Sequence, residues 1–142
     1  MLSQFSYPII STEKFVQTVA FYEDHFGYVS AFEMEGFVIL RRQDWPDMYL
    51  SVIDSTHDAI PAEYQRPVAG MILNMPVEDV MSAHQEAYWE GLNVVSEPKP
   101  ALCGRKHFFI EDPNGVLVDV AENVDLKTLM STDDFEALCI AA

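Results

Sequence analysis

One pattern of strand-like and helix-like segments occurs twice along the chain, and this repeat constrains the fold more than any other feature. Gly27 and Gly91 each end a helical pattern and lie 64 residues apart, and Ile10 and Asn74 lie the same distance apart within strand-like segments. A single copy provides one sheet and one helix, which is too little to cover both faces of the sheet. We therefore predict two βαβββ modules side by side, with the helices outside and a curved, partly closed mixed sheet around a shared concavity.

The first copy has the pattern of a strand, a helix and three further strands. Ser11 and Thr12 offer an N-cap for the helix, and Gly27 supplies its C-terminal stop. Glu35 and Gly36 form a tight turn between two strands. The predicted strands are residues 5–10, 28–34, 37–42 and 48–54. The apolar stripe of the helix consists of Phe15, Val19, Tyr22 and Phe26.

The second copy follows a connector that has no period and contains Pro61 and Pro67. Its helix is predicted to start at Pro76 and to stop at Gly91. The predicted strands are residues 70–75, 92–96, 104–111 and 116–122. The helical stripe consists of Val77, Val80, His84, Ala87 and Tyr88.

The length of 142 residues suits one domain with a single core. We therefore predict one α+β domain over residues 1–142. Its parts are module one at about 5–54, a connector at 55–68, module two at 69–122 and a C-terminal helical tail at 123–142.

The charge and the cysteine content limit which partners and which cellular compartment we expect for this chain. The 23 acidic and 8 basic side chains give a net charge of −15, which disfavours nucleic acid and anionic membranes and favours cationic ligands. No apolar run approaches the roughly 20 residues that span a bilayer, and we expect no secretory signal because the first residues have neither a basic nor an apolar segment. Cys103 and Cys139 have no metal-binding spacing, so we expect a reduced, cytoplasmic protein.

Several short motifs lie at the end of the first predicted helix, at the start of the second and before the last strand. Residues 21–22 read FY, residues 26–27 read FG, residues 77–80 read VEDV, and residues 111–119 read EDPNGVLVD. The last has a physical basis, because its Asp and Asn side chains bond to nearby backbone, its proline presets φ and its glycine adopts positive φ. With these motifs, residues 5–122 resemble the vicinal oxygen chelate superfamily. That superfamily includes glyoxalase I, extradiol dioxygenases, fosfomycin-resistance enzymes and bleomycin-resistance proteins.

The resemblance implies a place for a divalent metal, which metal-dependent members hold on two His and two Glu side chains from the first and last strands of each module. The matching positions here are Tyr7, Ser51, Ile72 and Asp119. Only Asp119 is a good ligand for a transition metal. The four histidines do not supply an alternative set: His25, His57, His84 and His107. We therefore expect no family-type metal and no other cofactor, although a displaced metal site stays open.

The strand period of two predicts which side chains line the concavity. The candidate ligand-binding residues are Tyr7, Tyr49, Ser51, Ile72, Asn74, Arg105, His107, Phe109 and Asp119. Aromatic walls with a few polar groups suit a planar ligand. His107 and Asp119 are also the candidate catalytic residues. The alternative is that both are structural: Asp119 would form an ion pair with an arginine, and His107 would be a half-buried side chain.

Three functions remain open on these grounds. The first is a metal-free protein, similar to the bleomycin-resistance branch, that binds a planar or cationic small molecule. The second is a metal-dependent lyase, isomerase or dioxygenase of the same superfamily with a degenerate site. The third is a scaffold with a vestigial concavity. The resemblance also implies a homodimer, because related proteins often complete the groove by pairing modules between chains.

Overall fold

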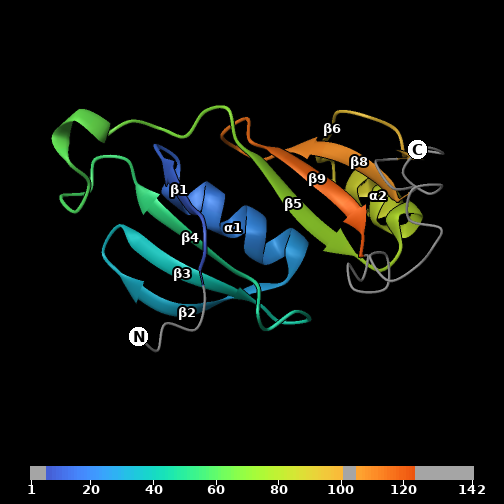
Figure 1. The fold of residues 1–142 in the computed structure, drawn as a ribbon, viewed down its shortest axis with the longest axis horizontal. Helices are drawn as coiled ribbons and strands as arrows, with labels where there is room; N and C mark the ends of the chain where they lie inside the picture. The colour runs from blue at the N-terminus through green and yellow to red at the C-terminus, as the bar shows by residue number, and fades with distance from the viewer. Residues whose placement is uncertain (1–5, 101–104, 124–142) are drawn as a thin grey trace, which may run out of the picture. The chain divides into compact units, whose positions relative to one another are not determined.

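The computed structural model describes residues 6–100 and 105–123 of the chain. The described residues fall into two compact units: one contains the chain up to Gly70 together with Pro113–Gly115, and the other contains Met71–Asp112 and the chain from Val116 onward. Each unit has one helix on one face of a mixed sheet (Figure 1), which confirms the α+β class and the two βαβββ modules. Of the predicted tail, only Asn123 is among the described residues. Cys103 and Cys139 lie outside them.

The first unit is a four-stranded sheet with the order β1-β4-β3-β2, in which only the β1–β4 pair is parallel. Its elements are β1 (Ile9–Thr12), α1 (Phe15–Phe26), β2 (Tyr28–Met34), β3 (Phe37–Arg42) and β4 (Tyr49–Asp54). Alternate side chains face α1 and are buried: Ile10, Val38, Leu40, Leu50 and Val52. The opposite face, which the unit's own helix leaves uncovered, is called the open face below.

The start of α1 differs from the prediction. Thr12 pairs with Asp54 in the parallel ladder, so β1 runs four residues to Thr12 instead of covering residues 5–10. The N-cap is Lys14, without a side-chain cap bond, and the Thr12 hydroxyl accepts a hydrogen bond from its N–H at 2.8 Å. Thr12, which the sequence predicted as an N-cap, is therefore part of the strand. The C-terminal stop is confirmed, because Gly27 adopts a left-handed φ of 67°.

The buried stripe of α1 is also shifted from the predicted one. Thr18, Phe21 and Tyr22 are its buried residues, whereas Phe15 and Val19 are half-exposed. Tyr22 is thus buried as predicted, but its buried neighbours are Thr18 and Phe21 instead of Phe15 and Val19.

Residues 55–68, predicted to be a plain connector, form an ordered loop whose two ends meet at β1. The Ser55 N–H donates to the Thr12 carbonyl at 2.9 Å, and the Val68 N–H donates to the Ser11 carbonyl at 2.8 Å. One turn of 3-10 helix, η1 (Ala62–Tyr64), lies between these ends. A compact loop with adjacent ends is an Ω-loop, a type that often carries function.

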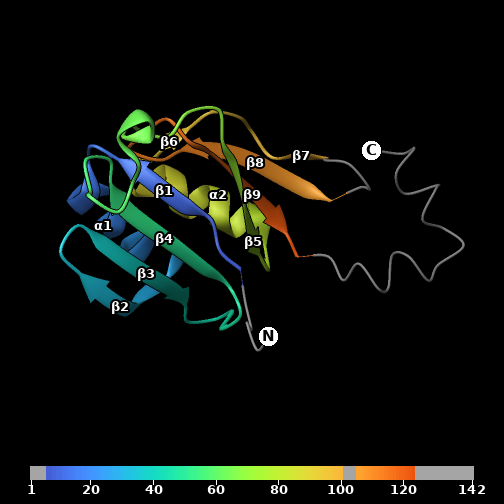
Figure 2. The ribbon, with the colours of Figure 1, turned by 60° about the vertical axis from the view of Figure 1, so that its left-hand side comes forward.

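The second unit repeats the topology with the order β5-β9-β8-β6, and a short additional strand pairs with β8. Its elements are β5 (Ile72–Val77), α2 (Val80–Trp89), β6 (Asn93–Val94), β7 (Lys99–Pro100), β8 (Lys106–Glu111) and β9 (Leu117–Glu122). Figure 2 shows α2 on one face of this sheet. The buried side chains of that face confirm the predicted face assignment: Met75, Phe108, Ile110, Val118 and Val120.

The helix of the second unit starts later than predicted. Pro76 lies inside β5, which is an edge strand and therefore tolerates a residue without an N–H. Asp79 is the N-cap of α2, and its carboxylate accepts hydrogen bonds from the N–H groups of Met81 and Ser82 at 3.0 and 3.2 Å. Of the predicted stripe, Val80 and Ala87 are buried, whereas Tyr88 is 72% exposed.

Candidate functional site

The open face of the second sheet carries a row of three candidate residues. Asn74 on β5 pairs with Asp119 on β9, which in turn pairs with Phe109 on β8. Since paired residues project from the same face of a sheet, the three side chains stand side by side. The strand register therefore brings together residues that lie far apart in the chain.

A hydrogen bond joins His107 to Asp119 on this face. The Nδ1 atom of His107 lies 2.8 Å from Oδ1 of Asp119, and the two side chains are only 13% and 17% exposed. The Phe109 ring meets the imidazole edge at a centroid distance of 5.1 Å. Because an ionised carboxylate only accepts, the Nδ1 atom carries the hydrogen, and Nε2 of the neutral ring is a hydrogen-bond acceptor.

This arrangement offers two kinds of chemistry. An imidazole held by a carboxylate presents a basic nitrogen in one orientation, which suits proton abstraction. The same nitrogen and carboxylate also suit recognition of a ligand that carries N–H groups, with the Phe109 ring as a flat apolar neighbour.

The two other candidates of the second unit lie at the margin of this row. Ile72 lies two residues before Asn74 on β5 and is 62% exposed. Arg105 directly precedes β8 and does not pair with Asp119, so the alternative of an arginine–aspartate ion pair is wrong for this carboxylate. Neither residue belongs to the His107–Asp119 pair.

The candidates of the first unit lie on β4 and before β1. Tyr49 and Ser51 share the open face of β4, whereas Tyr7 precedes β1. Ser51 is fully buried between Ile9 and Ile39 of the neighbouring strands. Among the described residues, its hydroxyl has no hydrogen-bond partner.

The parallel strand pair of each unit gives equivalent positions in the two units. Ile10 pairs with Val52, and Met75 pairs with Val120; all four are buried under the helix of their unit. This equivalence shifts the predicted spacing in the first strands from 64 to 65 residues. It also makes Ser51 the counterpart of Asp119, and Tyr7 the counterpart of Ile72.

The residues at the metal positions of the superfamily do not fit a transition metal. A hydroxyphenyl group, a serine hydroxyl and an isoleucine replace the ligands at three positions, and the carboxylate at the fourth is hydrogen-bonded to His107. Within residues 6–100 and 105–123, no group of three or more His, Cys, Asp or Glu side chains is placed to hold a metal ion.

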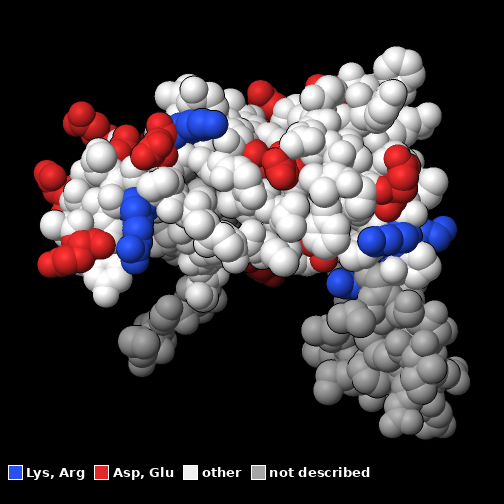
Figure 3. All heavy atoms as spheres, turned by 90° about the horizontal axis from the view of Figure 1, so that it is seen from above, with Lys and Arg blue, Asp and Glu red and all other residues white. Residues whose placement is uncertain are grey.

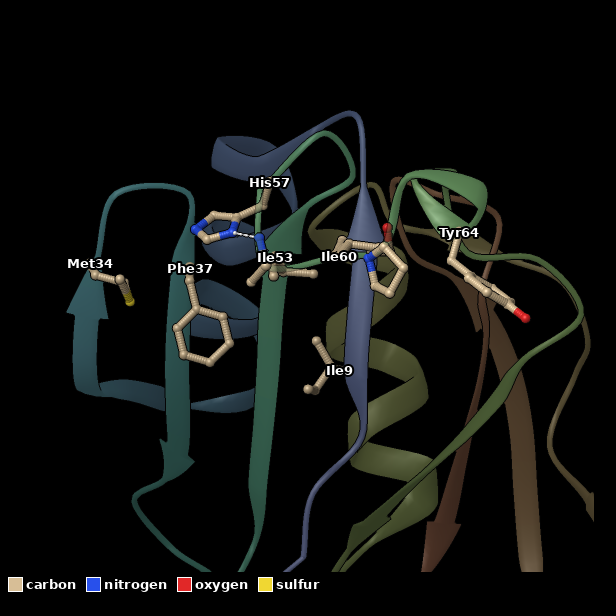
Figure 4. Close-up of a pocket in the computed structure, with 10 residues that line it drawn as sticks. Ile9, Met34, Phe37, Ile53, His57, Ile60 and Tyr64 are labelled. Atoms are coloured by element: carbon tan, nitrogen blue, oxygen red, sulfur yellow. Dashed lines mark hydrogen bonds between the residues drawn. The ribbon is translucent and has the colours of Figure 1, made fainter.

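Sequence reasoning missed that residues 55–68 form a pocket with the open face of the first sheet. A cavity of about 540 Å³ lies between the Ω-loop and the open face of the sheet. The sheet contributes Ile9, Phe37 and Ile53, and the loop contributes His57 and Ile60 (Figure 4). None of the predicted ligand-binding residues lines it. The sequence signal that could have indicated this pocket is the presence of Ile60 and Tyr64 in an otherwise polar loop.

Comparison with known proteins links this geometry to one family. The model of the glyoxalase/bleomycin resistance protein/dioxygenase superfamily matches residues 5–120. No curated protein matches the chain. Neither helix of the described chain has the length and apolar character needed to cross a membrane.

Solved structures with the same fold include proteins of different activity. A lactoylglutathione lyase from Agrobacterium tumefaciens is 20% identical, with a TM-score of 0.65 over 85% of this chain and 94% of that one. A bleomycin resistance determinant encoded on the transposon Tn5 is also 20% identical, with a TM-score of 0.61 over 85% and 98%. The oxidase ChaP-H2 is 16% identical, with a TM-score of 0.64 over 87% and 96%. At these identities the similarity concerns the fold.

Proposed function

Because the chain belongs to the glyoxalase/bleomycin resistance protein/dioxygenase superfamily, we propose that it binds a small molecule on the open face of its second sheet, without a family-type metal. The observation that carries this proposal is the His107–Asp119 hydrogen bond of 2.8 Å. In this bond, His107 donates to the carboxylate of Asp119, which is the only good metal ligand at the four metal positions of the superfamily.

The chemistry of the site favours a planar ligand that is cationic or rich in N–H groups. Asp119 supplies negative charge, Nε2 of His107 supplies an acceptor, and Asn74 stands beside them in register. The phenyl ring of Phe109 suits a flat group. Acidic side chains are scattered over the face of the molecule seen in Figure 3, and the net charge of −15 attracts cations over longer distances.

Benzamidine and benzoate form a matched pair of probes for this proposal, because both are planar and they carry opposite charges. We expect benzamidine to raise the melting temperature and benzoate to leave it unchanged. The Asp119→Asn variant keeps the size and a hydrogen-bonding side chain but loses the charge, and we expect it to weaken benzamidine binding in calorimetric titrations by about tenfold. Stabilisation by benzoate alone contradicts the proposal.

The metal-free part of the proposal has a separate test. Protein purified without chelator is analysed for Zn, Ni, Fe and Mn by mass spectrometry, and benzamidine binding is repeated after treatment with EDTA. We expect substoichiometric metal and unchanged binding. A full equivalent of one metal, together with loss of binding in EDTA, favours the metal-dependent lyase, isomerase or dioxygenase.

A second candidate function is an enzyme in which His107 acts as a general base. The observation that favours it is the orientation of the imidazole by Asp119, which leaves Nε2 free to accept a proton. Loss of turnover in His107→Gln with retained ligand binding would identify such an enzyme.

The assembly and location of the protein complete the proposal. We propose a homodimer in the cytoplasm, with a small molecule as ligand and neither nucleic acid nor membrane as partner. The family resemblance supports dimerisation and the acidic charge disfavours anionic partners. Light scattering coupled to size-exclusion chromatography tests the dimer.

A further inference from the structure

We infer that the pocket beneath the Ω-loop of the first unit is a second binding site, which takes a neutral aromatic group that carries a hydrogen-bond acceptor. The pocket lies entirely within the first unit and shares no residue with the His107–Asp119 site. The two sites can therefore be tested with separate variants.

The size and walls of the pocket suit a small molecule. Its volume of about 540 Å³ lies within the range of roughly 300–1,000 Å³ that is typical of ligand sites. Ile9, Phe37 and Ile53 form the floor on the open face of the sheet, and Ile60 and Tyr64 contribute from the loop (Figure 4). Apolar side chains of this kind favour a ring over a polar chain.

The loop that contributes to the pocket is held by hydrogen bonds, so the cavity is built before a ligand arrives. The Gln65 side-chain amide donates to the Ile60 carbonyl at 2.9 Å, and the Ser11 hydroxyl donates to the Arg66 carbonyl at 2.7 Å. The Arg66 guanidinium lies 5.7 Å from the centre of the Tyr64 ring. A preformed site of this kind loses little conformational entropy on binding.

The lining of the pocket offers no partner to a charged ligand group. No Asp, Glu, Lys or Arg side chain lines it, although the chain contains 23 acidic residues. A charged group would lose hydration against these apolar walls without gaining an ion pair. We therefore expect the pocket to favour an uncharged group and the His107–Asp119 site a cationic one.

Ser11, His57 and Tyr64 are the polar lining residues, and we assign the hydrogen bond to the ligand to His57. Its Nδ1 atom accepts a hydrogen bond from the Ala59 N–H at 3.0 Å, so in the neutral ring Nε2 carries the hydrogen and is a donor. The ring also packs against the turn at Gly36, where an added Cβ would lie 3.1 Å from Cδ2 of His57. These two contacts hold the imidazole in place, and Figure 4 shows its second nitrogen on the side away from the Ala59 bond.

Two naphthalene derivatives of nearly equal size test the inference. 2-Acetonaphthone carries a carbonyl acceptor, and 2-ethylnaphthalene carries none. We expect the full chain to bind 2-acetonaphthone about fivefold more tightly, because one hydrogen bond is added in an apolar site. We expect His57→Phe to bind both compounds with equal affinity.

Two aspartate substitutions at exposed positions separate the pocket from the rest of the surface. Ile9 lines the pocket and is 51% exposed, so Ile9→Asp is compatible with folding and should abolish binding of both compounds. Val16 is 75% exposed on α1, and Val16→Asp is the control that should leave binding unchanged.

Three outcomes would overturn the inference: no binding of either compound, equal affinity of the unmodified chain for both, or binding that survives Ile9→Asp. Loss of naphthalene binding in Asp119→Asn, with full binding in Ile9→Asp, would place the compounds at the second sheet and also overturn it. Failure of benzamidine to bind leaves this inference untouched, because the two sites share no residue.

Discussion

Ser51 is the residue whose burial most directly predicts the effect of a substitution. Its hydroxyl is fully buried and, among the described residues, has no hydrogen-bond partner. Such a group costs about 1–3 kcal/mol of stability. We therefore expect Ser51→Ala to leave the free energy of unfolding unchanged or to raise it by about 1 kcal/mol in urea titrations.

Thr18 provides the matched contrast to Ser51. It is equally buried, but its hydroxyl donates to the Lys14 carbonyl at 2.7 Å and accepts from the Asn114 amide at 3.0 Å. Thr18→Val removes both bonds at constant shape and should lower the free energy of unfolding by about 1–2 kcal/mol. An equal loss in Ser51→Ala would contradict the assignment of Ser51 as unsatisfied.

Tyr28 makes stability depend on pH in the alkaline range. Burial raises the pKa of its phenol from 10.0 to about 12, the effect of Asp44 acts in the same direction, and that of Arg42 opposes it. The folded state therefore holds the phenol proton more tightly than the unfolded state. The resulting stability is fully present below pH 10 and is lost between pH 10 and about 12 as the unfolded chain ionises.

The size of this effect follows from the difference between the two pKa values and amounts to about 3 kcal/mol. Urea unfolding of the unmodified chain and of Tyr28→Phe at pH 9 and pH 11.5 measures it. We expect a smaller loss of stability in Tyr28→Phe, which has no phenol to ionise at this position. Equal losses in both proteins would show that other groups cause the alkaline unfolding.

At the scale of elements, the turn from β8 to β9 stabilises the start of α1. Pro113–Gly115 belong to the first compact unit, where Asn114 accepts a hydrogen bond from the Thr12 hydroxyl at 2.5 Å and Lys14 donates to the Pro113 carbonyl at 3.0 Å. Thr12 and Thr18 are both fully buried, so neither can replace a lost bond with bulk water.

We therefore expect Asn114→Ala to lower the free energy of unfolding by about 1–3 kcal/mol, because two buried hydroxyls lose a partner. Gln17→Ala on the exposed side of α1 serves as the control, with an expected change within about 0.5 kcal/mol. Thermal and urea unfolding followed by circular dichroism measure both variants. Indistinguishable stabilities would mean that the turn does not contribute to the helix.

The elements themselves were predictable where local signals act without competition. Residues 28–34 and 37–42 form β2 and β3 at the predicted bounds, because the turn at Gly36 and the alternation on both sides agree. The helix starts were wrong where a strand ladder competes for the same residue. Thr12 and Pro76 are good helix starters, yet both lie in strands because their neighbours pair with β4 and β9.

At the scale of the whole molecule, the net charge of −15 opposes compactness through repulsion between like charges. Salt screens this repulsion, since the Debye length falls from about 30 Å at 0.01 M to about 10 Å at 0.1 M ionic strength. We expect the melting temperature to rise on the order of 5 °C between 10 and 300 mM salt. Calorimetry in NaCl and in KCl tests this, and a decrease in either salt would contradict it.

The sequence alone determined the two-module α+β fold and the faces on which the side chains of β5, β8 and β9 lie. Both depend on local periodicity: period two in the strands, a helical period between them, and a repeat of the whole pattern. The row of Asn74, Asp119 and Phe109 could therefore be anticipated, and the register of β5, β9 and β8 confirmed it.

Only the tertiary structure decided how single side chains are partnered. The choice of His107 over an arginine as the partner of Asp119, and the assembly of a pocket from β1, β3, β4 and the Ω-loop, require contacts between segments far apart in the chain. Such contacts depend on register and on loop closure, and periodicity in the sequence carries information about neither.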